Sequence, residues 1–489
     1  MIPINLEEDH AHRISHIFGC PLGALPLKYL GVPLHHTKLR REDLQPLVDK
    51  VIKRLAGWRG MLLSYGGRLV LIKSCLASIP IYLLSFIKFP KWAINLLNSH
   101  MAHCLWNNFD GQKNFHLANW PSVCMRKEYG GMGVPDLRDL NICLLGSWIK
   151  RYFGNNDQLW RQLVDYKYKT RDPNLFACRD TNTSQFWRGV MWAGNVAKFG
   201  YRWKIGDGKQ VKFWEDNWLG SSSLAILYWE VYVLVNEQTA TVSEVWDGEV
   251  LKCTFRRCFS PRLMRAWEEI IQLASTISFT GDEDYIIWQY NSNGVYSTQS
   301  LYKIVNYRGV TPIYTPSVWR LYIPPRIHVF LWLVAKNKLL TRDNLAKRKN
   351  IDDKTCIFCC DEESIHHLLF DCCVAKQIWI ELAAIIGLTN LNSYEQVASM
   401  WLSNKRFAAA NMFCASAMWA IWKLRNSMIF QNCRWRSSGQ IWQSMLGMLR
   451  NWMILCPTGQ MEAYVDWLKL VEWRAQRPEA ICWEADGED

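Results

Sequence analysis

A hydrophobic run long and uniform enough to cross a membrane is missing from this sequence. The most apolar stretch, Leu69 to Phe89, is interrupted by Lys73, Pro80 and Lys88. A membrane-spanning helix rarely carries two lysines and a proline in its apolar part. We therefore expect no membrane partner, and we predict that this stretch forms two buried helices that break at Pro80.

A secretory leader and a pattern of paired cysteines are also missing. The N-terminal residues MIPINLEEDH are acidic and polar, unlike the basic and apolar segments of a signal peptide. The seventeen cysteines are odd in number, and those outside one cluster are scattered from Cys20 to Cys482. These features predict a reducing, intracellular environment, where clustered cysteines bind metal more often than they form disulfides.

Acidic residues are scarce relative to basic ones. Lysine and arginine total 57 against 44 aspartates and glutamates, which gives a net charge of +13. This excess favours a polyanionic partner, most simply nucleic acid, although it can also serve solubility alone. With 489 residues, 49% of them hydrophobic and 21% charged, the chain is not disordered. Its length predicts about two to four folded domains.

A nucleotide-binding loop is not evident either. Gly130, Gly131 and Gly133 do not form a G-x-G-x-x-G pattern, and no strand is predicted before them. A glycine-rich turn that leads into a helix explains them better. No segment recurs at a fixed period, which excludes the common repeat architectures.

The sequence does have a dense group of metal-ligand side chains, with five cysteines and two histidines in an eighteen-residue stretch. The spacing C-x2-C-x7-H-x4-C within it is typical of a tetrahedral zinc site. This spacing selects Cys356, Cys359, His367 and Cys372. A C-x2-C pair lets one tight turn present two sulfurs, and a following helical segment can supply the other two ligands.

Two alternatives stay open for this cluster. Each ligand after the first has a duplicate beside it, at Cys360, His366 and Cys373, so the spacing alone does not fix which residues bind the metal. The cysteines could also be reduced residues that pack as small hydrophobic side chains beside a helix. Zinc is the better interpretation, because the residue types and spacings follow those of known zinc sites.

Basic residues precede the cluster. Arg342, Lys347, Arg348 and Lys349 lie in a short segment that contains one acidic residue, Asp343. Basic side chains beside a zinc module are typical of nucleic-acid contact, so these four are candidate nucleic-acid-binding residues. The alternative is the charged end of a helix without a ligand.

Helical periodicity dominates the chain and predicts a mainly α, multidomain fold with small β-hairpins. The predicted helices are 42–55, 66–77, 90–106, 327–333, 344–349, 374–388 and 418–430. Predicted N-caps are Ser64, Thr341 and either Ser297 or Thr298. The hairpins are predicted over 203–214, around a Gly-Asp-Gly turn, and over 284–297, around Asn293-Gly294. Residues 221–260 are poorly patterned and predict a loop or domain junction.

A series of short motifs carries a family resemblance. They are Lys28–Leu34, Leu63–Leu69, Ile79–Tyr82, Gly130–Gly133, Phe213–Asp216 with Trp218, Asn293–Ser297, Val318–Leu333, Leu340-Thr341, Cys356–Trp379, and Trp422 with Arg425-Asn426. In this order they resemble the C-terminal half of plant LINE-type (non-LTR) retrotransposon reverse transcriptases, including the reverse-transcriptase zinc-binding domain. The likeness covers roughly residues 25–430.

The resemblance implies an organisation and a role. It implies an N-terminal lead (1–24), a thumb-like helical region (25–150), a linker region with β-hairpins (151–300), a helical zinc-binding domain (301–390) and a C-terminal helical region (391–489). In the family pattern the histidine precedes a leucine, which favours His367 over His366. This half of the family's proteins is thought to bind nucleic acid in support of target-primed reverse transcription.

The residues that would make the chain a polymerase are not found. Reverse transcriptases use aspartates to hold two Mg²⁺ ions, and two of these lie in an aromatic-Ala-Asp-Asp hairpin between apolar strands. The comparable pair here, Asp352-Asp353, lies in a polar loop, and the spaced carboxylates of a ribonuclease H are not evident. A Cys–His nucleophile and base is disfavoured, because metal binding explains the duplicated ligands better. We predict no enzymatic activity and no small-molecule substrate.

The sequence therefore predicts a non-catalytic zinc- and nucleic-acid-binding fragment, with RNA or DNA as its partner. Such a protein would be nuclear if it binds chromosomal nucleic acid. One alternative is a zinc-stabilised protein-interaction module, with a polymerase or another protein as its partner. Another is a degenerate retroelement product with no selected function.

Overall fold

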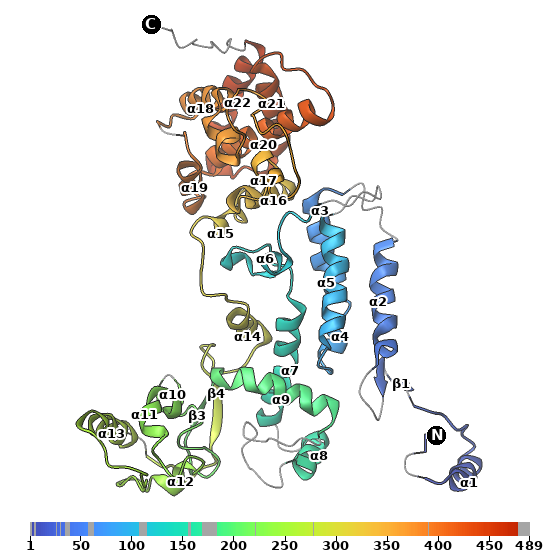
Figure 1. The fold of residues 1–489 in the computed structure, drawn as a ribbon, viewed down its shortest axis with the longest axis vertical. Helices are drawn as coiled ribbons and strands as arrows, with labels where there is room; N and C mark the ends of the chain where they lie inside the picture. Colours follow the sequence, from blue (N-terminus) through green and yellow to red (C-terminus); the bar gives the residue numbers. More distant parts are fainter. Residues whose placement is uncertain are drawn as a thin grey trace. The chain divides into compact units, whose positions relative to one another are not determined.

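The computed structural model is mostly helical, as predicted, with two small antiparallel sheets among the described residues (Figure 1). It describes residues 2–3, 6–25, 27–29, 31–34, 40–56, 63–106, 115–154, 158–168, 183–220, 222–276, 278–389 and 391–477. The chain forms two compact units. The first unit comprises Met1–Val51, Ser78–Leu97 and Asp136–Asn306, and the second comprises Ile52–Ala77, Asn98–Pro135 and Tyr307–Asp489. The five segments expected from the sequence stay predictions.

The elements have the following bounds. The α-helices are α1 Glu8–Phe18, α2 Arg41–Ala56, α3 Tyr65–Leu71, α4 Ile81–Leu84, α5 Lys91–Trp106, α6 Trp120–Cys124, α7 Leu137–Gly154, α8 Leu159–Tyr168, α9 Gln185–Ala197, α10 Leu224–Leu227, α11 Trp229–Tyr232, α12 Val242–Val245, α13 Pro261–Ala274, α14 Thr298–Val305, α15 Thr315–Val318, α16 Pro325–Ala335, α17 Arg342–Ala346, α18 Cys373–Ile386, α19 Tyr394–Leu402, α20 Ala408–Phe430, α21 Gly439–Trp452 and α22 Met461–Gln476. The π-helices are η2 Ile72–Leu76 and η6 His367–Asp371, and the 3₁₀ turns are η3 Lys127–Tyr129, η5 Lys198–Gly200, η7 Met453–Leu455 and η8 Thr458–Gln460. The strands are β1 Leu27–Tyr29, β2 Val32–Leu34, β3 Tyr201–Lys204 and β4 Tyr285–Trp288.

Local signals in the sequence set several of these helix boundaries. The Ser64 hydroxyl accepts a hydrogen bond from Gly67 N–H at 3.3 Å and so caps α3, as predicted. Ser297 caps α14 in the same way, with Ser300 completing a capping box. The predicted break at Pro80 is confirmed, since α4 begins at the next residue. Among the described residues, no helix combines the length and apolar character needed to span a membrane.

Both predicted hairpins over 203–214 and 284–297 are wrong. Strand β3 pairs instead with β4, more than eighty residues later, with Tyr201 opposite Trp288 (Figure 1). The buried Asp284 carboxylate explains the first error, because it accepts hydrogen bonds from the N–H groups of Gly206, Gly208 and Gln210 at 2.7–3.0 Å. These bonds wrap the Gly-Asp-Gly segment around the side chain of Asp284, which is distant in the sequence. The local turn signal could not reveal this partner.

The Asn-Gly turn fails for a different reason. A type I′ turn needs positive φ at both central residues. Gly294 has a φ of +67°, whereas Asn293 is not among the residues with positive φ. Trp288 N–H donates to the Gly294 carbonyl at 2.7 Å, and the chain then turns directly into α14. The segment makes a tight loop at the end of β4 and adds no strand.

One core of the first unit forms where α7, α9 and α14 pack together. Trp187, Tyr152 and Trp288 are among its fully buried side chains. The buried amide of Asn141, on α7, donates to the carbonyls of Leu84 and Ile87 at 2.7 and 2.9 Å. The same side chain thereby fixes the loop after α4 against α7.

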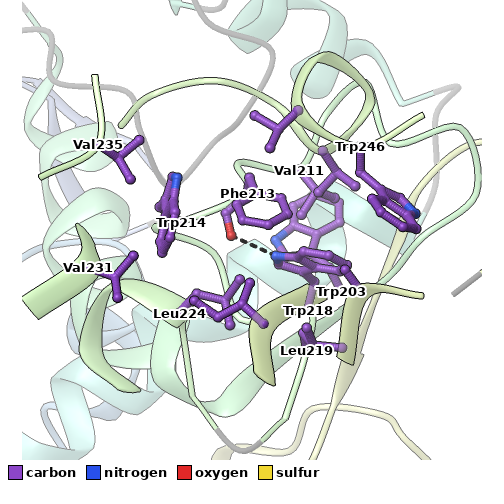
Figure 2. Packing of buried hydrophobic residues seen from close by; sticks show 14 residues of the cluster. Trp203, Val211, Phe213, Trp214, Trp218, Leu219, Leu224, Val231, Val235 and Trp246 are labelled. Atoms are coloured by element: carbon purple, nitrogen blue, oxygen red, sulfur yellow. Dashed lines mark hydrogen bonds between the residues drawn. The ribbon is translucent and has the colours of Figure 1, made fainter. Parts of the chain in front are cut away.

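A second core of the first unit is built from residues between 203 and 274 and is rich in tryptophan (Figure 2). Trp218 donates its indole N–H to the Phe213 carbonyl at 2.8 Å, so this buried polar atom is satisfied. The interpretation of residues 221–260 as a loop or domain junction misses three short helices, α10, α11 and α12, which place apolar residues in this core. Each is only four residues long, too short to show helical periodicity.

The second unit is built around α20. Every residue from Ala408 to Met418 on this helix is buried, and α18, α21 and α22 pack against it. Helix α3 contacts α16 in the same unit. Between α16 and α20 along the chain lies the segment that carries the predicted metal ligands.

Candidate metal centre

The ligand segment folds as a tight turn followed by a short π-helix. An antiparallel bridge joins Thr355 to Glu362, and Cys356 N–H donates to the Asp361 carbonyl at 2.7 Å. These bonds close the turn that presents Cys356 and Cys359. The π-helix η6 begins at His367, and its wider winding is a feature that recurs at functional sites. Cys372 then occupies the N-cap of α18.

The structure brings four predicted ligands together. One ligand atom from each of Cys356, Cys359, His367 and Cys372 lies within 4.8 Å of the others. The Cys372 sulfur is 3.9 Å from the sulfurs of Cys356 and Cys359, and the Cys359 sulfur is 3.1 Å from His367 Nε2. A tetrahedral ion with Zn–S bonds of about 2.3 Å would separate its sulfurs by about 3.8 Å. The donor set and its spacing therefore fit zinc.

The three duplicate residues lie outside this cluster. Cys360 is exposed, and Cys373 is the first residue of α18. His366 is half exposed and places its Nδ1 2.6 Å from the Asp371 carboxylate. The side chain of His367, in contrast, is only 11% exposed. The geometry thus separates residues that the spacing alone left equivalent.

The three thiols compete for negative charge when no cation neutralises them. A hydrogen bond with Cys372 lowers the pKa of the Cys356 thiol to about 5. Burial raises the pKa of the Cys359 thiol to about 11, and the hydrogen bond with Cys356 raises the pKa of Cys372. A divalent cation removes this competition, because it stabilises neighbouring thiolates together.

A buried ion pair behind the turn was missed by the sequence analysis. Glu363 is fully buried, and its two oxygens accept from Arg425 Nε at 3.0 Å and Nη2 at 2.5 Å. One of these oxygens also accepts from Arg342 N–H, at the start of α17, at 2.8 Å. Glu363 therefore ties the ligand turn to both α17 and α20. The available signal was Arg425 itself, one of two cations in the mostly apolar α20.

The four candidate nucleic-acid-binding residues differ in their surroundings. The Arg342 guanidinium donates hydrogen bonds to the Asp353 carboxylate and to the Thr355 carbonyl. Arg348 donates to the carbonyls of His116 and Leu117, at 2.9 and 3.3 Å. Lys347 and Lys349 are exposed, and Lys347 Nζ donates to the Asn344 side chain at 2.9 Å.

Comparison with known protein families matches the region of the metal cluster. Residues 296–379 match a family described as zinc-binding in reverse transcriptase. This range contains all four clustered ligands, so the zinc prediction agrees with both the family and the geometry. No polymerase domain is matched.

Two relatives from Arabidopsis thaliana are similar to longer parts of the chain. A "putative ribonuclease H protein" is 27% identical over 368 residues, which are 72% of this chain and 57% of the relative. An uncharacterized mitochondrial protein is 26% identical over 143 residues, which are 29% of this chain and 93% of that relative. The chain thus spans little more than half of the first relative. Together with the matched family, these relatives support a retrotransposon-derived protein.

Proposed function

We propose that this chain is a zinc-binding, nucleic-acid-binding fragment without catalytic activity, equivalent to the C-terminal half of a plant LINE-type retrotransposon reverse transcriptase. One observation carries the proposal: four ligand atoms within 4.8 Å of one another lie inside the range that matches the zinc-binding family. The net charge of +13 supports a polyanionic partner. If that partner is chromosomal, the protein acts in the nucleus.

Zinc serves this fragment as a structural cross-link. The residues that would hold it are Cys356, Cys359, His367 and Cys372. Four protein ligands complete a tetrahedral shell and leave no position for water or substrate, which is the arrangement of structural zinc sites. The ligands come from the turn, from η6 and from the N-cap of α18, so binding holds these three pieces together.

The proposed nucleic-acid surface lies beside the ligand turn. It contains the exposed Lys347 and Lys349, with Arg342 and Arg348 as the remaining predicted contacts. A signal that the sequence analysis missed extends it: the ring of Trp435 contacts Phe358 of the turn, with centroids 5.6 Å apart. Arg434 and Arg436, both exposed, flank that tryptophan. Cations grouped around an aromatic ring suit contact with phosphates and bases.

The salt dependence of binding tests this proposal. Affinity for a labelled 20-nucleotide RNA and a matched DNA duplex, measured by fluorescence anisotropy, should fall steeply between about 50 and 200 mM salt. Replacing Lys347 and Lys349 together by Ala should reduce the slope of log affinity against log salt by about 1.4–1.8, because two phosphate contacts are lost.

A charge-matched control accompanies that measurement. Lys209 and Lys469 are 75% and 70% exposed and carry the same total charge, so Lys209→Ala with Lys469→Ala should leave the slope unchanged. Binding that is insensitive to salt, or equal slopes for the two double variants, would contradict the proposed surface.

The environment of the Asp352-Asp353 pair supports a non-catalytic role. Asp353 accepts hydrogen bonds from the Thr355 N–H and hydroxyl at 2.8 and 2.6 Å, and it also contacts Arg342. The hydrogen bond from the Thr355 hydroxyl is the main reason that the pKa of Asp353 falls to about 2. Its carboxylate is thus used to hold the ligand turn. A polymerase clamp would need it to bind Mg²⁺.

A second candidate function, protein interaction, is favoured by an apolar cavity of about 500 Å³ in the second unit. Its lining includes Phe330, Trp419 and Trp422. It also includes Phe430, which is 76% exposed. Such a cavity suits an apolar helix of a polymerase-type partner. If a pull-down still recovers that partner after nuclease treatment, and Phe430→Ser abolishes the recovery, protein interaction is favoured. If nuclease treatment abolishes the recovery, nucleic-acid binding is favoured.

A further inference from the structure

The first unit contains a larger cavity whose lining includes none of the zinc ligands. It has a volume of about 860 Å³ and is lined by α9, η5, β3 and parts of residues 212–239. This size lies within the range of sites that hold small molecules or single nucleotides. We call it the Asn217 cavity, after a residue in its wall.

Asn217 has unused hydrogen-bonding groups. Its side chain is 8% exposed, and no described residue bonds either its amide nitrogen or its amide oxygen. The main chain at this position is fixed, because Trp203 N–H donates to the Asn217 carbonyl at 2.8 Å. A buried polar group without a partner is costly, and nearly all such groups in proteins are satisfied. An adjacent donor and acceptor are therefore available to a ligand.

Aromatic rings in the cavity wall offer surfaces for stacking. Trp229 and Phe199 both line the cavity, and they are 61% and 54% exposed. Trp229 lies 5.7 Å from the ring of Tyr232, another lining residue, which limits its freedom. Large exposed aromatic side chains at a cavity are typical of sites that stack bases.

The charges of the lining favour an anion. Arg188 and Lys198 are exposed there, and Lys212 adds a third cation. Two carboxylates also line the cavity, which leaves one positive charge in excess, and both have hydrogen-bond partners within the chain. Asp216 accepts from the Lys212 N–H at 2.8 Å, and Glu215 accepts from the Tyr232 hydroxyl at 3.4 Å.

We propose that the Asn217 cavity binds an adenine nucleotide, as one unit of a single-stranded nucleic acid. Asn217 would pair with the donor and acceptor of the adenine edge, the pairing that asparagine makes most readily. Trp229 or Phe199 would stack on the base, and Arg188 and Lys198 would contact its phosphate. This site goes beyond the proposed function, because it lies in the first unit and uses none of the zinc ligands or Lys347 and Lys349.

Saturation-transfer NMR with adenosine monophosphate tests the proposal on the full-length, zinc-loaded chain. The unmodified protein should transfer saturation to the adenine protons. Asn217→Leu preserves the residue's size and removes its hydrogen bonds, and Trp229→Ala removes an exposed ring. Each should raise the dissociation constant about tenfold. Trp473→Ala, which removes a tryptophan that is 47% exposed in the second unit, should change nothing.

Each outcome decides the matter. The proposal would be overturned if the unmodified protein showed no saturation transfer, or if both cavity variants showed as much transfer as the unmodified protein. If Asn217→Leu does not fold, Trp229→Ala still tests it. If these variants lost a bound protein partner but still bound adenosine monophosphate normally, the cavity would be a peptide site. That result would also overturn the proposal. Failure of the salt-dependence test alone would leave this site intact, since the Lys347 and Lys349 variant should still bind the nucleotide.

Discussion

Glu363 and Arg425 show how one residue pair can support a metal site without touching the metal. Removing one partner of a buried ion pair leaves an uncompensated charge inside the protein. We therefore expect Glu363→Gln to lower the free energy of unfolding of the zinc-loaded protein by about 3–5 kcal/mol, and to weaken zinc retention. Calorimetric unfolding and competition with a chelator would measure the two effects.

An exposed pair in the same unit provides the control. Arg450 and Glu472 lie 2.5 Å apart but are 55% and 41% exposed, so Glu472→Gln should cost at most about 1 kcal/mol. In addition, Glu363→Gln combined with Arg425→Met should cost less than the sum of the single changes, because no charge is left buried. Equal losses for the buried and exposed glutamates would contradict this account.

The separation of ligands from their duplicates leads to a second prediction at the residue scale. Replacing Cys356, Cys359 or Cys372 by Ser, or His367 by Gln, should reduce zinc well below one ion per chain. The neighbouring changes Cys360→Ser, His366→Gln and Cys373→Ser should keep about one ion per chain, because these side chains lie outside the four-ligand cluster. Elemental analysis of the purified variants decides between them. A zinc loss caused by Cys360→Ser would show a different ligand set.

Residue types and spacing were enough to predict the cluster, but not its supports. Cys356 and Cys359 could be predicted because both come from one tight turn, where sequence distance limits spatial distance. Glu363 and Arg425 are 62 residues apart, and nothing local links them. The same holds for Asn217, whose unused amide is visible only once Trp203 and its neighbours surround it.

At the scale of elements, the contact between α3 and α16 depends on one glycine. A Cβ at Gly66 would lie 2.6 Å from the Arg326 nitrogen and the Pro325 carbonyl carbon, both backbone atoms. Gly66→Ala should therefore separate the helices and lower stability by about 1–3 kcal/mol. A Cβ at Gly67 would have side-chain atoms of Leu63 and Ser64 as its nearest neighbours, the closest at 3.3 Å, so Gly67→Ala should gain up to about 1 kcal/mol of helix propensity. Scanning calorimetry would compare the stabilities of the two variants. If both variants were more stable than the unmodified protein, or both less stable, this explanation would be refuted.

Helices were more predictable than strands for a physical reason. The cap at Ser64 and the break at Pro80 act through neighbouring backbone groups, so the sequence nearby contains the signal. Strand β3 instead pairs with β4 across a long separation, and Asp284 organises a loop that begins at Gly206. Turn signals such as Asn293-Gly294 describe local preference, and here these distant contacts override it.

At the scale of the whole molecule, zinc should stabilise one part of the chain selectively. Residues 354–372 depend on the ligands for their conformation, whereas α9 and the β3–β4 pair contain no ligand and have their own apolar core. After treatment with a chelator, hydrogen exchange should accelerate in 354–372 and stay slow in α9 and β3–β4. Equal loss of protection in both regions, or none in either, would contradict a local structural role for zinc.

The composition of the two units could not be predicted from the sequence. Each combines three separate segments of the chain, and the segments alternate between the two units up to residue 135. Composition and periodicity describe neighbours in sequence, so they cannot reveal that residues 78–97 belong with 136–306. The mainly helical character was predictable, because it is a sum of local preferences.

The buried pair also bears on where the chain can be cut. The range that matches the zinc-binding family ends at residue 379. A protein truncated there would keep every proposed zinc ligand and lose Arg425. Glu363 would then lose the cation that neutralises it in the full chain. An autonomous piece therefore has to extend at least to Arg425, on α20. The end of a recognisable motif is set by ligand spacing, whereas the end of a foldable piece is set here by charge neutrality.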